Sequence, residues 1–285
     1  MQNFAPGGFC APQLAHAVTT KIVTGARLVS TPVPDFLDLP QRPAKPRETG
    51  LTHVIDTGLS PVDAENLMKT AAVHIDLIRL GFGSAYVTGA LQEKVDLYRS
   101  HGVPVALGGT LTELAWLQGR VEGLSEWLKE LGVEHVEVSS GSVAIPADEK
   151  SDLIRTLSAD FTVYAEVGEK DPDAIMAPYR WVESIQEALD AGASKVVCEG
   201  RASGDAGLYR RDGEPRTGLL DEVVHSIDFH RLIFEAPQRH QQVWFIEHLG
   251  PDVNLGNIRP DDVIPLETLR LGLRADTLHL FHRRD

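Results

Sequence analysis

The chain has 285 residues, 42% hydrophobic and 24% charged, so it is long enough to bury a large core as one big domain or two small ones. Its 27 basic and 41 acidic residues give a net charge of −14, which argues against nucleic acid or anionic membranes as partners, because both bind basic surfaces. The sequence has no apolar stretch of about 18 residues and no signal-peptide pattern. The only cysteines, Cys10 and Cys198, give no disulfide framework or Cys-based metal site, which favours the reducing cytoplasm.

The first part of the chain differs from the rest. Residues 1–40 are rich in proline and glycine and show no sustained helical or strand period. We therefore predict an N-terminal extension over residues 1–40 and one folded domain over residues 41–285.

Short β-rich runs then alternate with helical patterns. The eight predicted strands are residues 52–56, 74–80, 103–107, 135–139, 161–166, 195–200, 231–235 and 252–256. Their ends are 21 to 35 residues apart, and a (β/α)₈ barrel uses about 31 residues for each of its eight units. A doubly wound sheet usually needs fewer strands and has a Gly-rich first turn that is absent here. The pattern predicts an α/β fold, a single-domain (β/α)₈ TIM barrel.

Two helix boundaries have clear signals. Ser60 is followed by Pro61 and, three residues after the serine, by Asp63, which is typical of a capped helix N-terminus. Apolar residues recur at intervals of four and three over residues 117–131, and Gly132 follows. This spacing predicts one amphipathic helix that ends at the glycine.

In such a barrel the active site lies at the C-terminal ends of the strands. Five acids fall near these ends: Asp56, Glu137, Glu166, Glu199 and Glu235. A single acid of this kind is more often a solvated or salt-bridged loop residue, but gathering five is costly unless cations neutralise them. Glu166, Glu199 and Glu235 end three consecutive strands, and oxygen ligands alone suit a hard cation. We predict that these three residues bind Mg²⁺.

Two turns combine small residues with hydroxyl groups. Gly108-Gly109-Thr110 follows the third predicted strand, and Arg201-Ala-Ser203-Gly204 follows the sixth. Glycines end strands in any α/β protein, but exposed N–H groups beside Arg, Ser and Thr also suit a phosphate group. The full set of predicted substrate-binding residues is Lys45, Arg47, Asp56, Arg79, Gly109, Thr110, Glu137, Ser139, Arg201, Ser203, Gly204, Asn254 and Asn257.

Several blocks, in order, resemble the phosphosulfolactate synthase family. They are KPRETGLTHVIDTG (45–58), GGTLTELA (108–115), EVSSGS (137–142), EVGEK (166–170), CEGRASGDAG (198–207), FEAP (234–237) and DVNLGNI followed by LETLRLGLRADT (252–277). The resemblance covers residues 42–280. It implies a Mg²⁺-dependent TIM-barrel lyase that adds sulfite to phosphoenolpyruvate and forms (2R)-phospho-3-sulfolactate, for coenzyme M biosynthesis in archaea or sulfolactate formation in bacteria.

The resemblance also implies a mechanism. Sulfite is a strong nucleophile, so the reaction needs no activated Ser or Cys. Its attack gives an enediolate-like intermediate, whose charge a carboxylate-bound metal stabilises. A lysine after the fifth strand, which corresponds to Lys170, then acts as general acid. Family barrels commonly associate, so a homo-oligomer is expected.

One stretch departs from the family pattern. After the second strand the family usually has Lys-x-Gly-x-Gly-Thr-Ser, whereas residues 79–85 begin with Arg79 and end Gly-Ser-Ala. Arginine presents a planar fork rather than a compact point charge. An alternative therefore stays open: a non-catalytic or stress-related barrel, as in the plant heat-stress-associated relatives of this family, or an enzyme for a different phosphorylated carboxylic acid.

Overall fold

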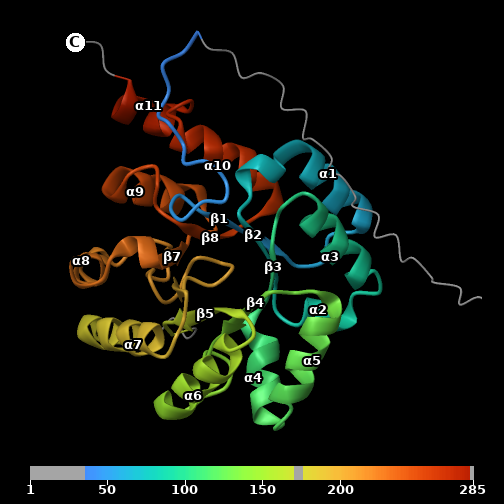
Figure 1. Cartoon of the computed structure of the whole chain (residues 1–285). Helices are drawn as coiled ribbons and strands as arrows, with labels where there is room; N and C mark the ends of the chain where they lie inside the picture. The colour runs from blue at the N-terminus through green and yellow to red at the C-terminus, as the bar shows by residue number, and fades with distance from the viewer. Residues whose placement is uncertain (1–35, 170–175, 283–285) are drawn as a thin grey trace, which may run out of the picture. The chain divides into compact units, whose positions relative to one another are not determined.

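The computed structural model describes residues 36–169 and 176–282. Eight parallel strands pair in chain order and close into a barrel, with β8 beside β1 (Figure 1). The strands are β1 (Thr52–Asp56), β2 (Leu77–Leu80), β3 (Val105–Leu107), β4 (His135–Val138), β5 (Thr162–Val167), β6 (Lys195–Cys198), β7 (Leu232–Glu235) and β8 (Leu255–Ile258). The predicted (β/α)₈ barrel is confirmed.

Helices follow the strands and surround the barrel (Figure 1). They are α1 (Pro61–Ala71), α2 (Ser84–Val87), α3 (Leu91–Ser100), α4 (Gly109–Leu117), α5 (Val121–Leu131), α6 (Ala147–Ser158), α7 (Pro178–Asp190), α8 (Thr217–Ser226), α9 (Arg239–Leu249), α10 (Val263–Arg270) and α11 (Ala275–Phe281). The predicted cap of α1 is confirmed, since the Ser60 hydroxyl accepts a hydrogen bond from the Asp63 N–H. Across both described ranges, every helix is too short or too polar to cross a membrane.

The prediction of one helix over residues 117–131 is wrong at its start. Leu117 is the last residue of α4, and its side chain is 59% exposed. The connection to α5 passes through Gly119 at φ 63°, a left-handed conformation that ends the helical path. The predicted stop is confirmed, because Gly132 follows α5 at φ 69°.

The two-residue period of the strands separates an outer core from an inner one. Outward side chains such as Val54 and Ile78 pack with the helices in the main core. A separate cluster comprises Leu77, Ala106, Tyr164, Val197 and Ile233. Four residues of this cluster are each followed, two positions later, by a charged residue: Leu77 by Arg79, Tyr164 by Glu166, Val197 by Glu199 and Ile233 by Glu235. An apolar layer therefore lies beneath a charged one at the C-terminal ends of the strands.

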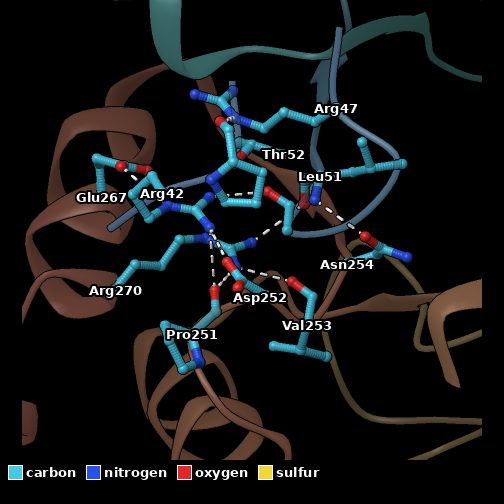
Figure 2. A network of polar contacts seen from close by, with 12 residues as sticks. Arg42, Arg47, Leu51, Thr52, Pro251, Asp252, Val253, Asn254, Glu267 and Arg270 are labelled. Carbon is cyan, nitrogen blue, oxygen red and sulfur yellow. Dashed lines mark hydrogen bonds and ion pairs between the residues drawn. The ribbon is translucent and has the colours of Figure 1, made fainter. Parts of the chain in front are cut away.

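At the opposite end, which we call the N-terminal face, Arg270 holds β1 and β8 together (Figure 2). This α10 side chain is fully buried. Its guanidinium donates to the backbone oxygens of Val253 at 2.7 Å and Leu51 at 3.1 Å, and also to that of Pro251. These carbonyls precede β8 and β1, so one side chain satisfies backbone acceptors from both ends of the barrel sequence.

Arg42 extends the same network (Figure 2). Its guanidinium lies 2.6 Å from the Asp252 carboxylate and 3.1 Å from that of Glu267, and it donates to the Gly50 oxygen at 2.8 Å. Because the partners come from the turn before β1, the turn before β8 and helix α10, the arginine fixes the segment that leads into the barrel.

Candidate active site

A cavity of about 340 Å³ lies at the C-terminal ends of the strands, and we call it the central cavity. Its lining includes Arg79 from β2, Glu137 from β4, Glu166 from β5, Glu199 after β6 and Glu235 from β7. A larger cavity, of about 760 Å³, lies against α2, α4 and α5 and has a mainly apolar lining with Arg120 as its charged side chain. The residues suited to chemistry therefore gather in the central cavity.

Arg79 lies among these acids and neutralises part of their charge. Its Nη1 is 3.1 Å from Glu235, 3.2 Å from Glu137 and 3.8 Å from Glu166. Burial lowers the pKa of Arg79, but the surrounding carboxylates outweigh burial and raise the pKa above its ordinary value. The guanidinium is thus a permanent cation held by the site itself.

Glu137, Glu166, Glu199 and Glu235, which we call the carboxylate layer, face Arg79 as their shared positive partner. Backbone groups also contribute: the Gly109 N–H donates to Glu137 at 3.2 Å and the Gly200 N–H to Glu235 at 2.9 Å. Burial raises the pKa of Glu235, against the opposing effect of Arg79. In the described part of the chain, four carboxylate side chains therefore gather around the Arg79 guanidinium.

Burial also sets the charge of the groups beside this layer. It raises the pKa of Glu137 to about 7, and Glu166 and Glu235 add to the increase while Arg79 opposes it. The His53 imidazole, 3.5 Å from Glu137, has a pKa lowered to about 3 by burial and by Arg79. At neutral pH His53 is uncharged, so the positive charge beside Glu137 comes from the arginine.

The raised pKa of Glu137 predicts a pH-dependent stability. Between 4.5 and about 7 the folded protein binds a proton at Glu137 that the unfolded chain releases. Its contribution to the free energy of unfolding should therefore fall as pH rises through this window, by up to about 3 kcal/mol. Urea titrations in metal-free buffer across this range should show the decline, and Glu137→Gln should reduce the slope. Equal slopes in the two proteins would contradict the assignment.

The acids of the central cavity match Mg²⁺ in ligand type but not in their arrangement. Carboxylate oxygens are the ligands that a hard divalent cation prefers, so Glu166, Glu199 and Glu235 suit it in type. Within residues 36–169 and 176–282, however, no three His, Cys, Asp or Glu side chains are gathered closely enough to form a ready metal site. Glu235 is instead in contact with Arg79, and Glu199 accepts a hydrogen bond from the Arg201 N–H at 2.5 Å.

Hydroxyl and guanidinium groups also line the central cavity. Thr110 lies in the first turn of α4, and Arg201 and Ser203 lie in the loop after β6. Gly204, at φ 72°, follows in this loop and accepts a hydrogen bond from Gln241 through its carbonyl oxygen. The two turns predicted to form an anion cradle are therefore brought together at one cavity.

Ser142 also lines the central cavity and was missed from the sequence. The buried Glu113 of α4 holds its loop: the carboxylate accepts from the N–H groups of Ser142 at 2.8 Å and Val143 at 2.7 Å. The predicted Ser139 donates its hydroxyl to Glu113 and packs against Gly109, where an added Cβ would lie 2.3 Å from the Ser139 Oγ. Ser139 thus supports the loop, and Ser142 faces the cavity.

Comparison with known proteins identifies the family. The family model of (2R)-phospho-3-sulfolactate synthase matches residues 40–276. The chain belongs to the phosphosulfolactate synthase family. Phosphosulfolactate synthase of Methanothermobacter thermautotrophicus is 42% identical over 86% of this chain and 96% of its own length. That of Bacillus subtilis is 40% identical over 86% of this chain and 99% of its own.

Two further similarities are more distant. The Arabidopsis thaliana protein HEAT-STRESS-ASSOCIATED 32 is 20% identical over 82% of this chain and 90% of its own length. Among solved structures, the YdjI aldolase from Escherichia coli K12 superposes with a TM-score of 0.51 at 11% identity, covering 75% of this chain and 76% of that one. This likeness shows the barrel fold alone.

Lys170, whose role as general acid the phosphosulfolactate synthase resemblance implies, lies outside the described residues. Asp56, which was predicted to belong to the site, is not among the residues that line the central cavity. Asp56 points outward from β1, where it contacts Lys94 at 2.5 Å and accepts a hydrogen bond from the Tyr98 hydroxyl at 2.7 Å. Asp56 therefore joins the barrel to α3 instead of facing the interior with the other four acids.

Three further predicted residues lie toward the N-terminal face. Lys45 donates to the carbonyl oxygen of Ala72 at 3.0 Å, and Arg47 pairs with Asp76 at 2.9 Å, both just before β2. Asn254 precedes β8 and bonds to the backbone of β7 and of the residues before β1. The prediction that these three residues bind substrate is corrected, because their backbone and carboxylate partners hold them at the end of the barrel opposite the central cavity.

Proposed function

We propose that this protein catalyses the addition of sulfite to phosphoenolpyruvate, giving (2R)-phospho-3-sulfolactate. The observation that carries the proposal is the carboxylate layer with Arg79 at the floor of the central cavity, in a chain 42% identical to a phosphosulfolactate synthase. The layer lies where TIM-barrel enzymes bind their substrates. Localisation in the cytoplasm and association into a homo-oligomer stay predictions.

The hydroxyl and guanidinium groups of the central cavity would bind the anionic groups of the substrate. Thr110, Ser142 and Ser203 offer hydroxyl groups, and Arg201 offers a guanidinium whose side chain is 44% exposed and so accessible to a ligand. Arginine and hydroxyl donors suit a phosphate, since charge-assisted hydrogen bonds are stronger than neutral ones. We place the phosphate at these donors and the three-carbon acid over the carboxylate layer.

The proposed chemistry requires charge stabilisation and one proton. The sulfur lone pair of sulfite forms a bond to the methylene carbon, the double-bond electrons move toward the carboxylate, and the neighbouring carbon takes up a proton. Glu166, Glu199 and Glu235 would hold Mg²⁺, which when bound supplies a Lewis acid for the developing negative charge. Arg79 neutralises part of the charge of the carboxylates, and we propose Lys170 as the proton donor.

A second candidate function rests on Arg79, which stands where the family usually has lysine. A forked guanidinium makes more than one directed hydrogen bond, so the same cavity would take a different phosphorylated carboxylic acid, or bind one without turnover. Phosphorus NMR detects whether a phosphorylated acid is turned over. Thermal-shift measurements detect whether it binds, because a ligand that binds the native state raises its melting temperature.

The test is a product assay with purified protein, Mg²⁺, phosphoenolpyruvate and sulfite. We expect a new phosphomonoester signal, its loss with EDTA, and its return when excess Mg²⁺ is added. Lys170→Ala should lower the rate by several orders of magnitude while the protein stays folded, because general acids commonly contribute a factor of about 10² to 10⁴. A folded wild-type protein that forms no phosphomonoester would overturn the proposal. Unchanged turnover of the variant would remove Lys170 from its role.

A further inference from the structure

Left-handed backbone is concentrated around one cavity. In the described part of the chain, three residues other than glycine have a positive φ: Phe82 at 59°, Arg201 at 60° and Asn257 at 54°. All three line the central cavity. A side chain in this conformation costs free energy that glycine would avoid, and such residues gather at functional sites. Of the three, Asn257 is the one whose side chain is also buried.

A bulge in β8 turns Asn257 toward the interior. Thr52 and Val54 of β1 pair with Leu255 and Ile258 of β8, so β8 contains one residue more than β1 over this interval. Leu255 and Ile258 both lie in the outer core, which regular alternation would not allow for residues three apart. The extra residue resets the alternation, and bulges beside active sites commonly redirect a side chain in this way.

The amide of Asn257 has unused hydrogen-bonding capacity. Its side chain is 1% exposed, yet among the described residues neither Nδ2 nor Oδ1 has a hydrogen-bond partner. Asn254, three residues earlier, is equally buried but fully used: its oxygen accepts from the Leu51 N–H, and its amide nitrogen donates to the oxygens of His230 and Leu232. Buried amides are normally satisfied, so the contrast indicates that the partner of Asn257 is a ligand.

From these observations we infer that Asn257 is a substrate-contacting residue, whose amide N–H donates to an oxyanion oxygen of the bound phosphorylated acid. The inference rests on the proposed function for the identity of that acid. A neutral donor suits this position, because the amide adds a directed hydrogen bond without changing the balance of charge between Arg79 and the carboxylate layer.

The inference is tested with two substitutions that a positive φ tolerates, Asn257→Gly and Asn257→Asp. Glycine removes the amide and relieves the backbone, so the melting temperature should hold or rise while KM for phosphoenolpyruvate rises about 10- to 100-fold, the range of one hydrogen bond to a charged group. Aspartate keeps the shape but adds a negative charge, so its effect on KM should be larger. Asn254→Ala serves as the contrast, with a lower melting temperature and little change in KM.

The wild-type protein is assayed first, so the inference and the proposed function fail separately. A wild-type protein without product formation refutes the function. A wild-type protein that turns over, with Asn257→Gly equal to it in KM and kcat/KM, overturns the inference. A lower melting temperature for Asn257→Gly would also count against it, since that result assigns the residue a structural role. Direct titration of phosphoenolpyruvate into each variant provides the same comparison without turnover.

Discussion

Arg79→Met should abolish most activity and lower the free energy of unfolding by about 3 to 5 kcal/mol, the usual loss when one member of a buried ion pair is removed. The methionine would leave the carboxylates of Glu137 and Glu235 without the cation that now lies 3.2 and 3.1 Å away. We expect turnover to fall at least about 100-fold, because the layer would repel the anionic substrate and lose its fixed geometry.

The loss of stability should depend on pH in a defined direction. Without the guanidinium, the pKa values of the buried carboxyl groups rise further, so the folded state binds protons that the unfolded chain releases. The destabilisation by Arg79→Met should therefore be larger near pH 8 than near pH 5.

Arg79→Lys is the control for this prediction. It keeps a positive charge but removes the planar, forked guanidinium. Compared with Arg79→Met, it should therefore restore most of the stability and part of the activity. Urea unfolding at the two pH values measures the first property, and the product assay measures the second. A stable, fully active methionine variant would show that the arginine does not neutralise the layer.

Arg270→Met should be the most damaging substitution away from the central cavity. It removes the donor to the carbonyl oxygens of Leu51, Pro251 and Val253. The Leu51 oxygen still accepts from the Leu255 N–H and the Pro251 oxygen from Arg42, whereas the buried Val253 oxygen loses its arginine donor. An unsatisfied buried polar group costs about 1 to 3 kcal/mol, so a loss of this size is expected from Val253 alone. Such a loss is a large fraction of the stability of many single domains, so lower soluble yield is expected.

Arg155→Met is the matched control, because it makes the same arginine-to-methionine substitution at an exposed position. Arg155 is 59% exposed and pairs with Asp152, also exposed, within α6. Surface pairs contribute about 0 to 1 kcal/mol, so this variant should unfold within about 1 kcal/mol of wild type. Urea denaturation compares the two variants. Equal midpoints would show that the N-terminal face does not depend on Arg270.

The barrel could be predicted because its eight units repeat at regular intervals, and all eight strands lie within three residues of the expected ranges. The eighth is the one displaced at both ends by two or three residues: it was placed over residues 252–256 but runs from Leu255 to Ile258. Its bulge at Asn257 inserts one residue into the pairing, and a local backbone conformation of this kind leaves no periodic trace in the sequence. Helix α5 was extended backward for a related reason, since the turn at Gly119 interrupts an apolar spacing that continues across it.

The candidate site was predictable where position along a strand determines position in space. Glu166, Glu199 and Glu235 were predicted from strand ends, and the structure brings them to one cavity. Asp56 fulfils the same criterion but faces α3, because both faces of a barrel strand are buried and the sequence does not reveal which face a residue takes. Ser142 was missed because Glu113, on a different helix, determines where its loop lies.

Arg270 also affects how the chain folds during its synthesis. The carbonyl of Leu51 and the side chain that satisfies it are 219 positions apart, so β1 leaves the ribosome long before α10 is made. Until then the first strand lacks both its neighbour β8 and its arginine, and it presents an open edge of the kind that pairs with other chains. Prematurely terminated chains should therefore aggregate, and chaperones should be needed until translation reaches the last helices.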